Sequence, residues 1–204
     1  MNELRKKIHK LRNEVSIQEK KNISQKLVST FVHELNGFGV FNKIHIASYR
    51  SINNEIMVES LEDALSDFNP IFYYPKVNLQ KERKMEMKNA SCLCQQGWEN
   101  GAYGILEPLS SCESISPEKL DFIVVPGIAY TDKRERMGSG KGYYDSYIIH
   151  TKNALTVAFA YDFQVVDELQ QNTWDQNVDW LITPSKQFKN INLVTKIEYI
   201  RNKK

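Results

Sequence analysis

Apolar side chains recur at helical spacing through the first 35 residues of the chain. Leu4, Ile8, Leu11 and Val15 lie three or four residues apart, which is the period of one buried helix face. Ser16, followed three residues later by a glutamate, fits a capping box, and the apolar period then resumes at positions 23, 27, 31 and 35. The pattern therefore predicts two N-terminal helices.

Five short apolar runs follow, and each has the length of a buried strand. They are residues 44–49, 71–75, 121–125, 155–161 and 180–183. Helix-compatible sequence lies between several of these runs, an alternation that is typical of a parallel sheet with helices on its faces. The runs therefore predict a mostly parallel sheet.

The segments between these runs are less strongly patterned. Asn53 or Asn54 is expected to cap a helix through the apolar positions 56, 61 and 65. The polar segment 81–94 is a possible small hairpin beside the main sheet. Together the patterns predict a single α/β domain over residues 1–204, with a mostly parallel, Rossmann-like open sheet flanked by helices.

A glycine-rich loop follows the third apolar run. That run ends in Pro-Gly, and a charged stretch then supplies Gly138, Gly140 and Gly142 just before a helix-compatible segment. Glycines allow backbone amides to approach a ligand closely, and Arg136 and Lys141 add two positive charges. Ligands of open parallel sheets bind beyond the carboxyl ends of the strands. The loop is therefore predicted to bind phosphate groups, although it fits neither of the two most common nucleotide-binding motifs and a plain glycine-rich turn remains an alternative.

Composition excludes several other classes of protein. The chain has 27 basic and 25 acidic residues, a net charge of +2, which argues against nucleic acid as the partner. The sequence has no apolar run of 18 residues and no signal peptide pattern, so we expect a cytoplasmic protein without a membrane partner. Cys92, Cys94 and Cys112 lack further ligands at metal-binding spacing, and we expect reduced thiols.

The glycine-rich loop and several other segments resemble the 5-formyltetrahydrofolate cyclo-ligase family, also called methenyltetrahydrofolate synthetases. The resemblance runs in order along nearly the whole chain. The matching segments are Leu4-Arg5-Lys6 with Arg12 and Ser16, residues 49–55, Tyr74-Pro75-Lys76, Gly104-Ile105-Leu106-Glu107-Pro108, residues 126–130 and 136–145, and residues 163–169 leading to Asp175 and Asp179.

The resemblance implies an enzyme that uses ATP and Mg²⁺ to cyclise 5-formyltetrahydrofolate to 5,10-methenyltetrahydrofolate, with release of ADP and phosphate. The reaction would pass through a phosphorylated formyl group, an iminium phosphate. It implies small-molecule substrates only, with no obligatory protein partner.

The resemblance also implies roles for individual residues. Arg136 and Lys141 would be catalytic, and Asp145 and Asp175 would hold Mg²⁺, with Asp167 and Asp179 as open alternatives. ATP would contact Asn2, Arg5, Arg136, Met137, Gly138, Ser139, Gly140, Lys141, Gly142, Tyr143 and Tyr144. The folate would contact Arg50, Glu55, Ser139, Gly140, Lys141, Gly142 and Tyr143.

The residues themselves leave other interpretations open. Glu55 would also suit the first turn of a helix, where an acidic side chain is favoured. Tyr143 and Tyr144 would also suit simple packing. For the whole chain, the alternatives to an enzyme are a non-catalytic folate- or nucleotide-binding relative and an RNA-associated protein with a basic helix.

Overall fold

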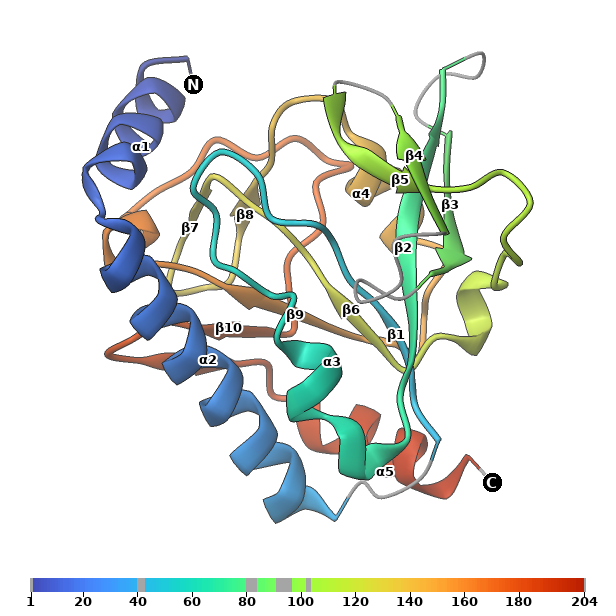
Figure 1. The fold of residues 1–204 in the computed structure, drawn as a ribbon. Coiled ribbons are helices and arrows are strands. Elements are labelled where there is room, and N and C mark those ends of the chain that lie inside the picture. The colour runs from blue at the N-terminus through green and yellow to red at the C-terminus, as the bar shows by residue number, and fades with distance from the viewer. Residues whose placement is uncertain (1, 40–42, 80–83, 91–96, 102–103, 204) are drawn as a thin grey trace.

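The computed structural model describes residues 2–39, 43–79, 84–90, 97–101 and 104–203. Both predicted N-terminal helices are present, α1 over Asn2–Glu14 and α2 over Ile17–Phe38 (Figure 1). Ser16 caps α2, because its Oγ accepts a 3.2 Å hydrogen bond from the backbone N–H of Glu19. Gly39 ends α2 in the left-handed conformation, with φ of 68°.

A seven-stranded sheet forms the centre of the fold, in the order β11-β10-β9-β6-β1-β2-β3. Its strands are β1 (His45–Ala47), β2 (Ile71–Asn78), β3 (Lys84–Asn89), β6 (Phe122–Val124), β9 (Leu155–Phe159), β10 (Trp180–Ile182) and β11 (Gln187–Lys189). The five strands β10, β9, β6, β1 and β2 are parallel, whereas β3 and β11 pair antiparallel at the two edges. Each predicted apolar run forms one of the parallel strands, so the mostly parallel α/β sheet is confirmed.

Shorter elements surround this sheet. Two small two-stranded sheets pair β4 with β5 and β7 with β8. Their strands are β4 (Trp98–Asn100), β5 (Leu106–Pro108), β7 (Ala129–Tyr130) and β8 (Arg136–Met137). The remaining helices are α3 (Leu61–Ala64), η1 (Ser66–Phe68), η4 (Pro117–Lys119), α4 (Tyr143–Ile148), η5 (Asp162–Gln164) and α5 (Leu193–Asn202).

The hairpin predicted near residues 81–94 takes a different form from the one expected. β3 pairs with β2 and so extends the main sheet instead of forming a hairpin beside it. Cys92 and Cys94 lie outside the described residues, whereas Cys112 is a free thiol.

The prediction of a helix starting at Asn53 or Asn54 is wrong. Both residues have positive φ, 48° and 57°, and two successive left-handed residues cannot continue into a right-handed helix. The segment is instead a loop held by Ser51, whose Oγ lies 3.0 Å from the carbonyl oxygen of Ile56 and 2.8 Å from a carboxylate oxygen of Glu59, so that its single hydrogen can be donated to either one. These side-chain bonds replace the helical backbone bonds, and α3 is a single turn.

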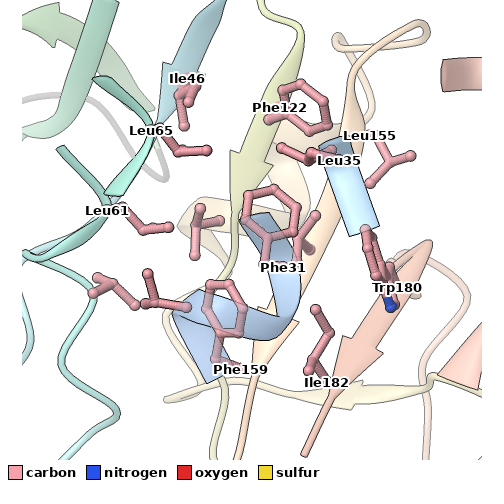
Figure 2. Packing of buried hydrophobic residues seen from close by; sticks show 14 of the residues in the cluster. Phe31, Leu35, Ile46, Leu61, Leu65, Phe122, Leu155, Phe159, Trp180 and Ile182 are labelled. Carbon is pink, nitrogen blue, oxygen red and sulfur yellow. The ribbon is translucent and has the colours of Figure 1, made fainter. Parts of the chain in front are cut away.

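The core lies on both faces of the sheet, because alternate residues of each strand point to opposite sides. On one face, Phe31 of α2 packs against Phe122, Phe159 and Trp180, with ring centroids 5.9, 5.7 and 5.5 Å away (Figure 2). α3 and α5 contribute to the same cluster. α4 packs on the other face through Tyr147. None of the helices among the described residues has the length and apolar character needed to span a membrane.

Candidate active site

A cavity of about 190 Å³ lies beyond the carboxyl ends of β1 and β6. Loops after both strands form part of its wall, as expected for an open parallel sheet. The lining residues are Tyr49, Arg50, Ile52, Glu55, Tyr74, Pro75, Val77, Met85, Ile105, Leu106, Glu107, Pro126, Gly127, Ile128, Arg136, Gly138, Ser139, Lys141, Gly142, Tyr143, Tyr144 and Asp145. The structure therefore brings together most of the residues that the sequence predicted for a site.

Helix α1 packs over the glycine-rich loop. Ile8 shares a core cluster with Ile128 and Met137 of the β7–β8 segment. Arg5, on the same helix, donates from Nε and Nη2 to the carbonyl of Gly138, both at 3.3 Å. Helix α1 therefore holds the start of the glycine-rich loop, at Met137 and Gly138.

Several predicted ATP contacts lie away from the cavity wall. Met137 is buried against α1, and neither Gly140 nor Arg5 belongs to the lining. Asn2 is the first residue of α1. The left-handed backbone of Gly140 and Gly142, with φ of 93° and 72°, explains why glycine suits these two loop positions. Roles for these residues in ATP binding stay predictions.

The buried Arg136 forms an ion pair with Asp145, which is partly buried. Arg136 donates from Nη2 to Asp145 Oδ1 and from Nη1 to the carbonyl of Pro126 at 3.1 Å. The backbone N–H of Gln176 donates to the same Asp145 oxygen at 3.2 Å. Arg136, which is predicted to bind phosphate, thus contacts Asp145, which is predicted to bind the metal ion. The contact fixes the orientation of both side chains.

Asp175 does not line the cavity. Its Oδ2 accepts 2.7 and 3.3 Å hydrogen bonds from the backbone and side-chain N–H groups of Asn172. Its chain neighbour Gln176, however, contacts Asp145, so the two predicted metal carboxylates belong to adjoining segments. Within the described part of the chain, no three His, Cys, Asp or Glu side chains gather as a metal site.

A pair of carboxylates nevertheless fits Mg²⁺ on chemical grounds. Mg²⁺ in nucleotide sites takes one or two carboxylates, with phosphate oxygens and water supplying the other ligands. Asp145 lines the cavity, and the hydrogen bonds that it accepts from the described residues go to Oδ1, which leaves Oδ2 as an acceptor for a further ligand. Asp179 is a poorer candidate, because its Oδ2 already accepts from Thr156 at 2.9 Å and from Lys196 at 2.6 Å.

Glu55 places a carboxylate in the cavity wall. Its Oε2 accepts from the backbone N–H of Ile52 at 3.2 Å, and its Oε1 lies 3.9 Å from Nη1 of Arg12. Burial raises the pKa of the Glu55 carboxyl to about 6, and the nearby Arg12 charge acts against that rise. Because no helix starts here, helix stabilisation does not explain this residue.

Tyr74 and several apolar side chains form another part of the cavity wall. The Arg50 guanidinium lies 4.9 Å from the centre of the Trp98 ring, and that ring meets Tyr74 edge-on with centroids 5.0 Å apart. Val77 of β2 and Met85 of β3 also line the cavity, together with Ile105 and Leu106 at β5. A flat, partly apolar ligand would find surface to cover on this side.

Tyr143 and Tyr144 pack as the sequence allowed and also lie at the cavity, whereas their contact with a ligand stays a prediction. Each packs against the second core cluster and also lines the cavity. The Tyr144 hydroxyl is buried without a hydrogen-bond partner among the described residues, and burial raises its pKa. The phenol therefore stays protonated and can donate a hydrogen bond into the cavity.

A model of the 5-formyltetrahydrofolate cyclo-ligase family matches residues 1–184. This chain belongs to that family. Membership in the cyclo-ligase family places it among the ligases of folate one-carbon metabolism. The resemblance found in the sequence is thereby confirmed.

Relatives and solved structures agree with the family assignment. A probable 5-formyltetrahydrofolate cyclo-ligase of Schizosaccharomyces pombe is 35% identical over 103 residues, which are 44% of this chain and 50% of that protein, so this alignment spans about half of the relative's length. The cyclo-ligase of Haemophilus influenzae is 27% identical over 176 residues, covering 85% of this chain and 91% of that protein. The NMR structure of Aquifex aeolicus 5,10-methenyltetrahydrofolate synthetase has a TM-score of 0.76 at 31% identity, covering 92% of this chain and 91% of that chain.

Some cyclo-ligase residues at the cavity received no individual role from the sequence. Glu107 is buried, lines the cavity and accepts from the backbone N–H of Val77 at 3.4 Å, with the ammonium of Lys76 4.0 Å away. Arg12 is buried behind Glu55. Its position four residues after Ile8, on the apolar face of α1, is the signal that could have indicated this burial.

Proposed function

We propose that this chain catalyses the ATP-dependent cyclisation of 5-formyltetrahydrofolate to 5,10-methenyltetrahydrofolate. The observation that carries the proposal is that one cavity contains both the Glu55 carboxylate with its apolar wall and the glycine-rich loop with Arg136 and Lys141. Two ligands of different chemistry would meet there.

The folate would occupy the side formed by Glu55 and the aromatic wall. A carboxylate accepts hydrogen bonds from adjacent N–H groups such as those of a pterin, and aromatic faces cover flat rings. Above about pH 6 the Glu55 carboxyl is ionised and acts only as an acceptor. The cyclisation should therefore weaken as pH falls through about 6.

The phosphate groups of ATP would lie against the loop. Lys141 is exposed at the cavity wall, and its ammonium can reach a ligand there. Arg136 is held by Asp145 and by the Pro126 carbonyl, so its charge is oriented before a ligand arrives. Asp145 and Asp175 would hold Mg²⁺, which neutralises phosphate charge when it is bound.

The chemistry needs ATP because a formyl group on nitrogen is a poor electrophile. The formyl oxygen would attack the terminal phosphorus and displace ADP, giving an iminium phosphate. Nitrogen 10 of the folate would then attack the formyl carbon and lose its proton, and inorganic phosphate would leave with the oxygen. The chain would contribute charge stabilisation during phosphoryl transfer and proximity during ring closure.

The test is an assay of the purified full chain with 5-formyltetrahydrofolate and magnesium ATP, following the absorbance of the methenyl product and the release of ADP. We expect both products in equal amounts and neither when ATP is omitted. Binding of folate or ATP without turnover would instead favour the non-catalytic relative. A cytoplasmic location and the absence of macromolecular partners stay predictions.

A further inference from the structure

Arg12 is an unusual residue for the helix that carries it. Its side chain is 2% exposed, whereas Lys10 on the same helix is 79% exposed. Burying a guanidinium is unfavourable unless the surrounding groups compensate its charge. Arg12 does not line the cavity, so it has no direct access to a ligand.

The contacts of Arg12 go to two parts of the cavity wall. Nη2 donates to the carbonyl of Gly127 at 2.5 Å, and Nη1 lies 3.9 Å from Oε1 of Glu55. Both partners line the cavity. Nε and Nη1 make no hydrogen bond to the described residues, so the Glu55 carboxylate is the anionic group that lies near this guanidinium. Arg12 therefore contacts two residues of the cavity wall without lining the cavity itself.

Arg12 supplies the positive charge in the surroundings of Glu55. The titratable groups that act on Glu55 or are acted on by it are Arg12, Glu59, Tyr49, Tyr130 and Tyr144. Burial and the Glu59 charge raise the pKa of Glu55, and Arg12 lowers it. Without Arg12, burial and the Glu59 charge would still raise the pKa of Glu55, and the hydrogen bond from the Ile52 N–H would remain to act against that rise.

We propose that Arg12 is a positioning residue that acts through Glu55, holding its carboxylate ionised and in place at the cavity wall while tying α1 to the Gly127 carbonyl. This inference rests on the proposed cyclo-ligase function, in which Glu55 accepts hydrogen bonds from the folate. A protonated Glu55 would lose part of its accepting capacity, and the folate would then bind less well at neutral pH.

The decisive measurement is the pH profile of kcat/KM for 5-formyltetrahydrofolate in wild type and in Arg12→Met. Removing an opposite charge at this separation raises a carboxyl pKa by about 1 to 3. If the pKa of Glu55 rises by about 2, the acidic limb of the kcat/KM profile moves to higher pH. At pH 7, kcat/KM then falls by about tenfold, and it recovers at higher pH. The KM for ATP should change by less than about threefold, because the loop contacts remain.

Two further variants separate this role from a purely structural one. Lys10→Met removes a positive charge from the exposed face of the same helix and should leave the profile unchanged. Arg12→Lys keeps a charge near Glu55, so the acidic limb of its pH profile should stay close to that of wild type. If Arg12→Met does not fold, Arg12→Gln, which also removes the charge but keeps a polar side chain, takes its place.

A double-mutant cycle completes the test. If Arg12 acts through Glu55, adding Arg12→Met to Glu55→Gln should cost little further activity. Three outcomes would overturn the proposal. The activity losses of the two single variants could add up in the double variant, or Arg12→Met could lose the same share of activity at every pH. The acidic limb of the Arg12→Lys profile could also be displaced as far as that of Arg12→Met. Wild-type protein that forms no methenyl product would instead refute the cyclo-ligase function itself.

Discussion

Gly127 lies three residues after the end of β6, at a point where the structure has no room for a side chain. A Cβ at this position would lie 2.5 Å from the hydroxyl oxygen and 2.6 Å from Cζ of Tyr130, and 3.1 Å from Cγ of Arg136. Tyr130 has no exposed surface and donates to the Val125 carbonyl at 3.3 Å, so its ring cannot move aside easily. Gly127→Ala should therefore force the core to shift.

The expected cost lies at the upper end of the range for overpacked cores, about 3 kcal/mol. For a chain of 204 residues, each kcal/mol lowers the Tm by roughly 2–4 °C, so Gly127→Ala should melt about 6–12 °C below wild type. Activity should fall as well, because the Gly127 carbonyl accepts from both Arg12 and Gln164 and the Cβ would press on Arg136.

Gly37→Ala is the matched control. Gly37 lies in α2, and a Cβ there would meet nothing within 4 Å. Alanine is the better helix former by about 0.5–1 kcal/mol, so this variant should melt slightly above wild type. Thermal melts of wild type, Gly127→Ala and Gly37→Ala test this prediction. A Gly127→Ala protein that melts within about 2 °C of wild type would show that the packing argument is wrong.

Three further predictions concern the proposed reaction. Lys141→Ala should lower kcat by roughly 100-fold or more with saturating substrates, as for loss of a preorganised donor, while the Tm stays near that of wild type; wild-type turnover in the folded variant would remove Lys141 from the mechanism. Glu55→Gln should lower kcat/KM for 5-formyltetrahydrofolate by about 30-fold, equivalent to about 2 kcal/mol for a hydrogen bond to a charged group; a change confined to the KM for ATP would contradict the folate role. Excess chelator should abolish turnover, and Mg²⁺ should restore it, because Asp145 and Asp175 are expected to hold the ion; full activity in chelator would exclude that site.

Local pattern was sufficient for much of the fold. The five apolar runs predicted all five parallel strands, because a strand buried on both faces needs apolar residues at nearly every position. The capping pattern at Ser16 predicted the start of α2 for a similar reason, since the Oγ and the amide that it caps are neighbours in sequence. The glycine-rich loop was recognisable because glycine is required by the backbone itself at Gly140 and Gly142.

Local pattern failed where distant residues compete with the backbone. The expected helix after Asn53 does not form, because Ser51 and Glu59 bind the loop and Tyr161 donates to the Asn54 carbonyl at 3.3 Å. That last contact joins residues 107 positions apart, and helical propensity contains no information about it.

The sequence by itself determined the family, the strands and the residue types of the site. Only the tertiary structure decided which of those residues support one another. Arg5 meets Gly138 across 133 residues and Arg12 meets Gly127 across 115 residues, because α1 packs on the β7–β8 segment. Whether a buried charge such as Arg12 or Glu55 is paired depends on these distant contacts, since electrostatic energy follows distance in space and exclusion of water, not distance along the chain.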